Sequence, residues 1–261
     1  MSKGKVKANY LHREGLVGLS DAPDYGFLYT TSLVKDPKWN IGDRVVLPDG
    51  REFAYSKSSG VVASGQAAEF VATGAIPYTL LSVDAAIGDK QLSFVASTHD
   101  AIAKDALRGG YCVTWPAALK DQTRGIIGND VSAENAAITI YLDAPLSVAV
   151  TTATAGEVYE NPYANLINTG GGSSSRAKAG IAATYVAATA TYFWVQIRGF
   201  VFIAIQSDMI TNKIGGYFRH DGSVQTQVAV ASLGGNDTTQ YAGHRIIGDY
   251  DNNGPLFYLQ G

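Results

Sequence analysis

Residues 187–206 read AATATYFWVQIRGFVFIAIQ and carry the strongest strand signal in the chain. Their centre, residues 192–199, combines aromatic and β-branched side chains, and both kinds favour the half-buried surface of a β-strand. A second apolar run, residues 200–205, follows Gly199. Each run is too short to span a bilayer, and Arg198 interrupts the pair. We therefore predict a buried β-hairpin that turns near Arg198 and Gly199.

Both faces of the first predicted strand carry large side chains. Because successive side chains of a strand point to opposite faces, Tyr192 and Trp194 share one face while Phe193 and Val195 share the other. Two apolar faces on one strand indicate that each is covered, by a second sheet or by another subunit. The predicted core residues are Phe193, Trp194, Val195 and Phe202.

Composition extends the β prediction to the whole chain. Only 16% of the 261 residues are charged and 29 are Gly, which is typical of turn-rich β architecture and not of a helical bundle. We predict an all-β body, a sandwich or barrel of short antiparallel strands with at most one or two short helices. The clearest helix candidate runs from Thr98 to Leu107 and ends at Gly109 and Gly110.

The predicted organisation has four parts. Residues 1–40 form an extended, irregular N-terminal arm, and residues 41–167 form a β domain. The Gly/Ser-rich residues 168–180 form a loop or linker, because such sequences behave as flexible coils. Residues 181–261 form a C-terminal β region, either separate or continuous with 41–167.

Charge and cysteine content restrict the partners. A formal net charge of -3 predicts no nucleic-acid binding by the body. The single cysteine, Cys112, cannot form an internal disulfide, so the fold does not need an oxidising compartment. No N-terminal signal segment or membrane-spanning run is visible. We expect synthesis in a cytoplasm, without standard secretion and without a membrane partner.

The arm combines basic and aromatic residues. Short basic arms on acidic bodies commonly bind an anionic partner, the alternative being a solvated tail. Aromatic side chains in a turn-rich segment need a surface to lie on, either the chain's own body or a neighbour's. We hypothesise that this surface belongs to a neighbouring subunit, of the capsid shell or of the same oligomer. The predicted contact residues are Lys3, Lys5, Lys7, Arg13, Tyr25, Phe27, Tyr29 and Trp39.

Catalytic, nucleotide-binding and metal-binding patterns are weak. Hydrolase-elbow and phosphate-loop motifs do not occur, and the four histidines never pair at metal-ligand spacing. Because neighbouring side chains of a strand point to opposite faces, adjacent pairs such as His99-Asp100 and His220-Asp221 rarely act together. Residues 249–254, DYDNNG, match the start of a calcium loop, but Gln260 stands where a bidentate Glu belongs. We predict no catalytic residue, no cofactor and no structural calcium.

Several short phrases together carry a resemblance. They are residues 49–55 (DGREFAY), 63–65 (ASG), 86–89 (AIGD), 109–111 (GGY), 161–163 (NPY) and 192–196 (YFWVQ) with Gly199. Their order and spacing, from about Tyr25 to the C-terminus, resemble head proteins of tailed bacteriophages that decorate or cement an HK97-type capsid.

The resemblance implies a structural virion protein without enzyme activity or cofactor. Such proteins sit on the capsid exterior as oligomers, often trimers, where major capsid subunits meet. The expected partners are therefore the major capsid protein and further copies of this chain. A phage adhesin or carbohydrate-binding β-module is the alternative, because exposed aromatic residues with Asp and Asn loops also bind sugars. A glycosidase on a β-scaffold would need two facing carboxylates, which the sequence alone does not exclude.

Overall fold

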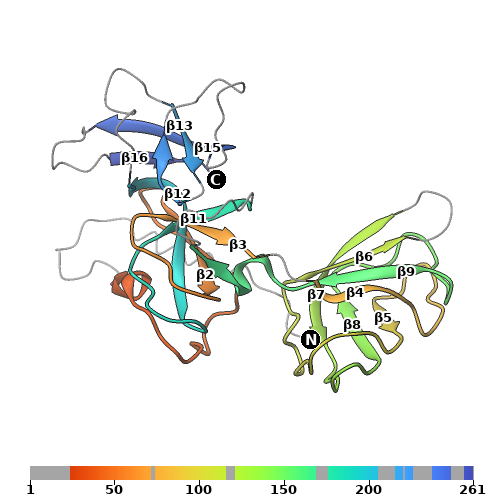
Figure 1. Cartoon of the computed structure of the whole chain (residues 1–261). Helices are drawn as coiled ribbons and strands as arrows, with labels where there is room; N and C mark the ends of the chain where they lie inside the picture. The colour runs from red at the N-terminus through yellow and green to blue at the C-terminus, as the bar shows by residue number, and fades with distance from the viewer. Residues whose placement is uncertain are drawn as a thin grey trace, which may run out of the picture. The chain divides into compact units, whose positions relative to one another are not determined.

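The computed structural model divides the chain into two compact units. Unit 1 comprises Met1–Val71 and Tyr163–Gly261, and unit 2 comprises Ala72–Pro162 (Figure 1). The structure describes residues 24–71, 74–115, 121–168, 176–204, 215–219, 221–225, 237–247 and 256–260. Within these ranges the chain is nearly all antiparallel strands, with two short 3-10 helices, η2 (Gly26–Tyr29) and η3 (Pro162–Ala164). The predicted all-β fold class is confirmed.

Unit 1 holds the larger sheet. Its strands are β1 (Arg44–Val46), β2 (Glu52–Lys57), β3 (Ala67–Phe70), β10 (Leu166–Ile167), β11 (Lys178–Ala182), β12 (Tyr192–Phe202), β13 (Gly215–Arg219), β14 (Val224–Gln225), β15 (Asp237–Ile247) and β16 (Leu256–Leu259). They follow the order β10-β3-β11-β12-β16-β15-β13-β14, and β2 joins β12 to β1. Figure 1 shows β12 extending from β2 and β11 toward β16.

Strand β12 is continuous, so the predicted hairpin is wrong. Its first part pairs with β2 and β11, and residues 199–202 pair with β16. The register shifts between Gln196 and Arg198, and Gly199 has a φ of 91°. A Cβ at Gly199 would lie 2.9 Å from Arg51 Cα, so a glycine is required at this close approach. The strand bends here and changes partners without folding back.

The two faces of β12 are both covered by the same chain. Trp194 packs with Leu28, Leu47, Phe53 and Tyr55 in one buried cluster. On the other face, Phe193 and Val195 belong to a second cluster with side chains such as Ala54, Val62 and Leu166. The predicted burial of Phe193, Trp194 and Val195 is confirmed.

The predicted burial of Phe202 is wrong, because this residue is 58% exposed. Beyond Gly199 the strand presents Phe200 and Phe202 outward, and Val201 between them enters a third buried cluster. Side chains alternate along this part of the strand, and it is Val201, not Phe202, that faces the core.

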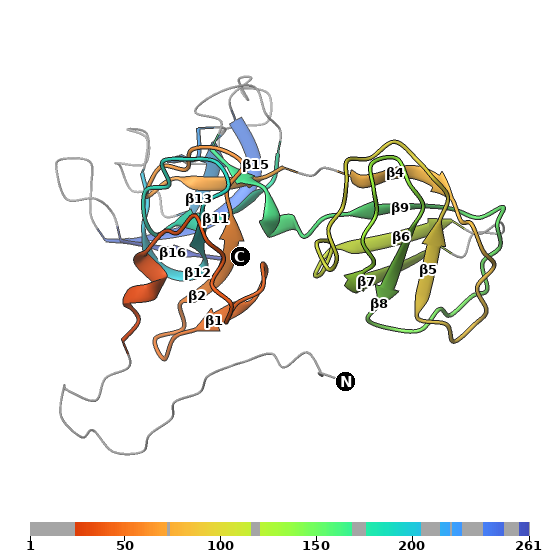
Figure 2. The same cartoon turned by 90° about the horizontal axis from the view of Figure 1, so that it is seen from below.

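Unit 2 is a closed barrel. Its strands are β4 (Gly74–Leu80), β5 (Gln91–Phe94), β6 (Tyr111–Trp115), β7 (Gln122–Asn129), β8 (Ile138–Leu142) and β9 (Ala155–Tyr159), in the order β4-β9-β6-β7-β8-β5. A bridge between Leu81 and Phe94 joins the two ends of this sheet. Hydrogen bonds from Val95 N to Leu80 O (3.1 Å) and from Ser82 N to Ser93 O (2.8 Å) complete the closure. Figure 2 shows the strands around a common interior.

The interior of the barrel is filled by apolar side chains, as expected for a small barrel without a channel. They include Ile76, Phe94, Cys112, Ile140 and Val158. Closure leaves this sheet few unpaired strand edges, which are otherwise prone to aggregation.

The predicted helix from Thr98 to Leu107 is absent. Ile102 instead forms an antiparallel bridge with Ser132, and residues 104–109 form turns. The buried side chain of Asn129 explains the difference: it accepts a hydrogen bond from Leu107 N (2.9 Å) and donates one to Ala103 O (2.9 Å). Asn129 thus stands between the two groups that an α-helix would join directly, and Ala103 O also accepts a turn hydrogen bond from Ala106 N (3.2 Å).

The predicted domain boundaries need correction. The stretch 41–167 is divided between the two units, because unit 2 is inserted into unit 1 after Val71. Of the predicted linker 168–180, residues 178–180 belong to β11, while residues 169–175 lie outside the described residues.

Two aromatic positions of β12, one buried and one exposed, give a stability test. Trp194→Ala empties a buried aromatic site and should lower the free energy of unfolding by about 3–5 kcal/mol. Phe202→Ala removes an exposed ring from the same strand and should cost less than about 1 kcal/mol. Denaturant unfolding of both variants measures the contrast, and equal losses would show that the assigned faces of β12 are wrong.

The reactivity of the buried Cys112 thiol measures how often the unit 2 barrel opens. Burial raises the pKa of its thiol from 9.0 to about 12, so the thiolate that reacts with disulfide reagents is not formed in the folded barrel. We expect Ellman's reagent at pH 8 to label Cys112 only as fast as the barrel opens, and at once in denaturant.

The same shift gives a pH dependence. Above about pH 9 the unfolded chain loses the thiol proton while the folded chain keeps it, so stability should fall as the pH rises toward 12. Cys112→Val should remove this part of the alkaline destabilisation. Rapid labelling of the native protein would contradict the burial of the thiol.

Candidate functional site

The outer face of the C-terminal strands carries a row of rings. Phe200 of β12 lies opposite Tyr258 of β16, with ring centroids 5.2 Å apart. His244 of β15 lies opposite Tyr258 on its other side, stacked at 5.4 Å. Three neighbouring strands thus place three rings side by side, the cross-strand arrangement that stabilises aromatic pairs.

The row continues in both directions. Phe202 lies opposite Leu256, and both are exposed. Tyr217 of β13 lies opposite Tyr241 of β15, with centroids 5.3 Å apart. We call this surface the aromatic face; its members are Phe200, Phe202, Tyr217, Tyr241, His244, Leu256 and Tyr258.

The opposite side of the same strands is core. Val201, Phe218, Phe257 and Leu259 alternate with members of the aromatic face and form a buried cluster. A sheet with core on one side normally presents polar side chains on the other. Apolar surface left in water is unfavourable by about 25 cal/mol per Å². Contiguous exposed apolar surface of this kind marks interaction sites.

Charge is placed at the border of the aromatic face. Arg198 precedes Phe200 by two residues on the same side of β12 and forms an ion pair with Glu52 of β2 at 3.4 Å. Apolar centres with charged rims are typical of surfaces that bind other proteins.

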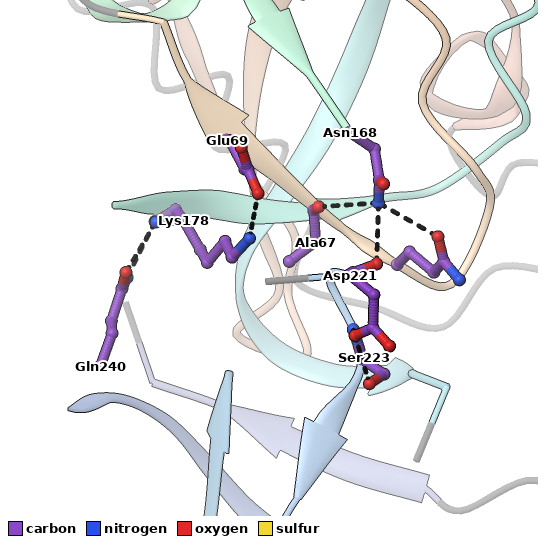
Figure 3. A network of polar contacts seen from close by, with 8 residues as sticks. Ala67, Glu69, Asn168, Lys178, Asp221, Ser223 and Gln240 are labelled. Carbon is purple, nitrogen blue, oxygen red and sulfur yellow. Dashed lines mark hydrogen bonds and ion pairs between the residues drawn. The ribbon is translucent and has the colours of Figure 1, made fainter. Parts of the chain in front are cut away.

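A buried ion pair fixes the strands behind this surface (Figure 3). Glu69 of β3 and Lys178 of β11 are cross-strand neighbours whose side chains are 1% and 0% exposed. Burial lowers the pKa of Lys178, and the ion pair with Glu69 opposes that shift. An ion pair removed from water in this way is strongly destabilised when one partner is lost.

Gln240 of β15 joins the C-terminal strands to this pair. Its Oε1 accepts a hydrogen bond from Lys178 N (2.6 Å), and its Nε2 donates one to Lys178 O (2.9 Å). The side-chain amide thus reproduces the two bonds of a strand partner. Because β15 carries Tyr241 and His244, this contact positions the aromatic face.

Asn168 makes a second connection, also visible in Figure 3. Its Nδ2 donates to Gln66 Oε1 (3.1 Å), Ala67 O (3.2 Å) and Asp221 O (3.2 Å). Asp221 Oδ1 in turn accepts bonds from the backbone and hydroxyl of Ser223. The network ties the turn before β14 to β3, and its buried members serve structure.

The aromatic residues of the predicted arm lie on the chain's own body. Phe27 and Trp39 contact the Trp194 ring at 5.7 and 5.0 Å, and Tyr25 packs against the same cluster. Tyr29 accepts a hydrogen bond from Arg51 Nη1 at 2.8 Å.

The backbone supports this placement. Ser32 and Tyr192 exchange two hydrogen bonds, of 3.0 and 2.7 Å. This corrects the expectation that residues 24–39 extend to a neighbouring subunit, because the apolar face of Trp194 is an intramolecular partner for them. The basic residues Lys3, Lys5, Lys7 and Arg13 lie outside the described residues.

The His-Asp pairs and the calcium-like loop noted in the sequence have no catalytic or metal-binding geometry among the described residues. His99 is buried, with Nδ1 2.6 Å from Asp100 O and Nε2 2.8 Å from Ala136 O, so its ring bridges two loops. His220 and the calcium-like residues 249–254 lie outside the described residues. In the part of the chain that is described, no three His, Cys, Asp or Glu side chains are placed to hold a metal ion.

Sequence reasoning missed the aromatic face. The alternation of Phe200 and Phe202 was visible, but their exposure depends on the bend at Gly199 and on pairing with β16, which are tertiary features.

Comparison with protein-family models, with curated proteins and with solved structures finds no match for this chain. Among the described residues, no helix has the length and hydropathy needed to cross a bilayer. The function is therefore inferred from the residues and their geometry.

The buried pair yields a stability prediction. Lys178→Met leaves the buried Glu69 carboxylate without its cation and should cost about 3–5 kcal/mol of unfolding free energy. The double variant Glu69→Leu/Lys178→Met should recover most of that loss. Arg198→Ala breaks an exposed cross-strand pair and should cost about 1 kcal/mol or less. If Lys178→Met is as mild as Arg198→Ala, the pair does not hold the strands.

Proposed function

We propose that this chain is a structural protein of a tailed-phage virion that attaches to the major capsid protein through the aromatic face. The observation that supports this most is the exposure of Phe200 and Phe202 beside Tyr258 on the outside of a sheet whose inside is core. The sequence resemblance to capsid decoration proteins points to the same class of partner.

The chemistry of the aromatic face suits burial against a protein. Aromatic side chains are enriched in protein interfaces, where a few of them carry most of the binding energy. Phe200, Tyr258 and His244 are held by ring contacts and by strand pairing, so little conformational freedom is lost on binding. A rigid surface of this kind needs no rearrangement to dock.

The proposal includes self-association and location. A capsid presents many copies of one binding site, and an oligomer, most simply a trimer, converts weak single contacts into firm attachment. The chain would be made in the host cytoplasm and would reside on the capsid exterior as a cement protein without enzyme activity. The basic residues Lys3, Lys5, Lys7 and Arg13 would add a salt-sensitive contribution to attachment.

Co-sedimentation with empty heads of the phage that carries the chain tests the proposal. Phe202→Asp places a charge in the aromatic face and should weaken attachment by about 30-fold or more, as for a central interface residue. Val131→Asp introduces the same charge at an exposed apolar residue of unit 2, which is 73% exposed and not a member of the aromatic face, and should leave attachment unchanged.

Both variants should keep the native melting temperature, because both positions are exposed. Undiminished attachment of Phe202→Asp would refute the assigned surface. Failure of the unaltered chain to sediment with heads would refute the proposed function.

A further inference from the structure

We propose that the outside of the unit 2 barrel, over β4, β9 and β6, binds a neutral sugar ring of a glycan. The residues concerned are Tyr78, Tyr111, Trp115, Glu157 and Tyr159, which we call the barrel platform. This site is separate from the aromatic face of unit 1, and the inference does not depend on the proposed attachment to capsids.

The first half of the platform is a stacked pair. Trp115 of β6 and Tyr78 of β4 have ring centroids 5.9 Å apart and planes inclined by 27°. Strand β9 lies between their strands, and its small residue Ala155 is paired with Trp115. The two rings therefore meet across β9. Tyr78 is 70% exposed, so the pair offers a broad ring surface to solvent.

The second half lies farther along the same strands. Tyr111 of β6 is the direct partner of Tyr159 on β9. Trp115 and Tyr111 are four residues apart on one strand, or about 13 Å at the usual rise. Two ring surfaces thus stand on one face of the barrel, with Val113 of β6 and Glu157 of β9 at the register position between them.

A carboxylate lies between the two halves. Glu157 is two residues before Tyr159 and is paired with Val113, which separates Tyr111 from Trp115. Its hydrogen bond with Tyr159 raises the pKa of that phenol. The Glu157 carboxylate lies beside Gly74, where a Cβ would be 3.1 Å from Oε1. The absence of a side chain at Gly74 leaves that oxygen space on β4.

This combination matches a sugar. A pyranose ring has an apolar C–H face, which aromatic rings can cover, and hydroxyl groups at its edge. A carboxylate accepts hydrogen bonds from hydroxyls strongly, and phenols can donate or accept. One carboxylate among neutral groups favours neutral sugars and repels acidic ones.

The same carboxylate argues against a protein partner at this place. A second copy of the chain or another protein covering the platform would bury Glu157 away from water, which is costly unless a cation pairs with it. Charged residues are depleted from the centres of protein interfaces for this reason. A hydrated sugar leaves Glu157 both solvated and hydrogen-bonded.

A glycan array that carries neutral, amino and acidic sugars gives the first test, with the full chain as the probe. We expect binding to neutral glycans, which titration calorimetry with the selected oligosaccharide then measures. Tyr78→Ala should weaken the affinity by about tenfold, which is the loss of one aromatic contact. Tyr185→Ala removes a tyrosine of unit 1 that is 57% exposed and should leave the affinity unchanged.

Two further variants distinguish glycan binding by the barrel platform from capsid attachment by the aromatic face. Glu157→Gln should weaken neutral-glycan binding and admit acidic glycans, because the charge is lost while the shape is kept. Phe202→Asp should keep glycan binding even where it loses attachment to heads. No array signal, a preference for acidic glycans in the unaltered chain, or equal effects of Tyr78→Ala and Tyr185→Ala would overturn the inference.

Discussion

The bend of β12 at Gly199 is the constraint on which unit 1 depends. Up to Arg198 the strand pairs with β2 and β11, and from Gly199 it pairs with β16. A positive φ of 91° and a backbone neighbour within 2.9 Å of any Cβ restrict this position to glycine. One strand thus supplies backbone hydrogen bonds to two groups of strands and carries core side chains for both.

The bend also explains the two different surfaces of unit 1. Before the bend, residues 24–39 of the same chain cover Trp194, so that face of the strand is buried within the chain. After it, no comparable cover from the described residues lies over Phe200 and Phe202. The buried pair Glu69 and Lys178, with Gln240, then holds β15 against β11 and keeps the outer rings in register. Burial and exposure along one strand therefore follow from where its partners change.

The sequence predicted those features that depend on residues close together in the chain. Aromatic and β-branched runs identified the strands and the burial of Phe193, Trp194 and Val195, and Gly-rich turns identified the all-β class. It did not predict that unit 2 is inserted after Val71, because no change in composition marks that point. The helix expected near Ile102 does not form, because Asn129, distant in sequence, binds Leu107 N and Ala103 O, which a helix would join to each other. The aromatic face was missed since exposure of Phe202 depends on pairing with β16.

Hydroxyl-radical footprinting of the chain, free and attached to heads, tests the central claim most directly, because side chains oxidise according to their exposure. The account predicts that attachment protects Phe200, Phe202 and Tyr258, while Tyr78 and Tyr185 oxidise as they do in the free chain. Protection of Tyr78 with undiminished oxidation of Phe202 would contradict it, and would place the capsid contact on unit 2.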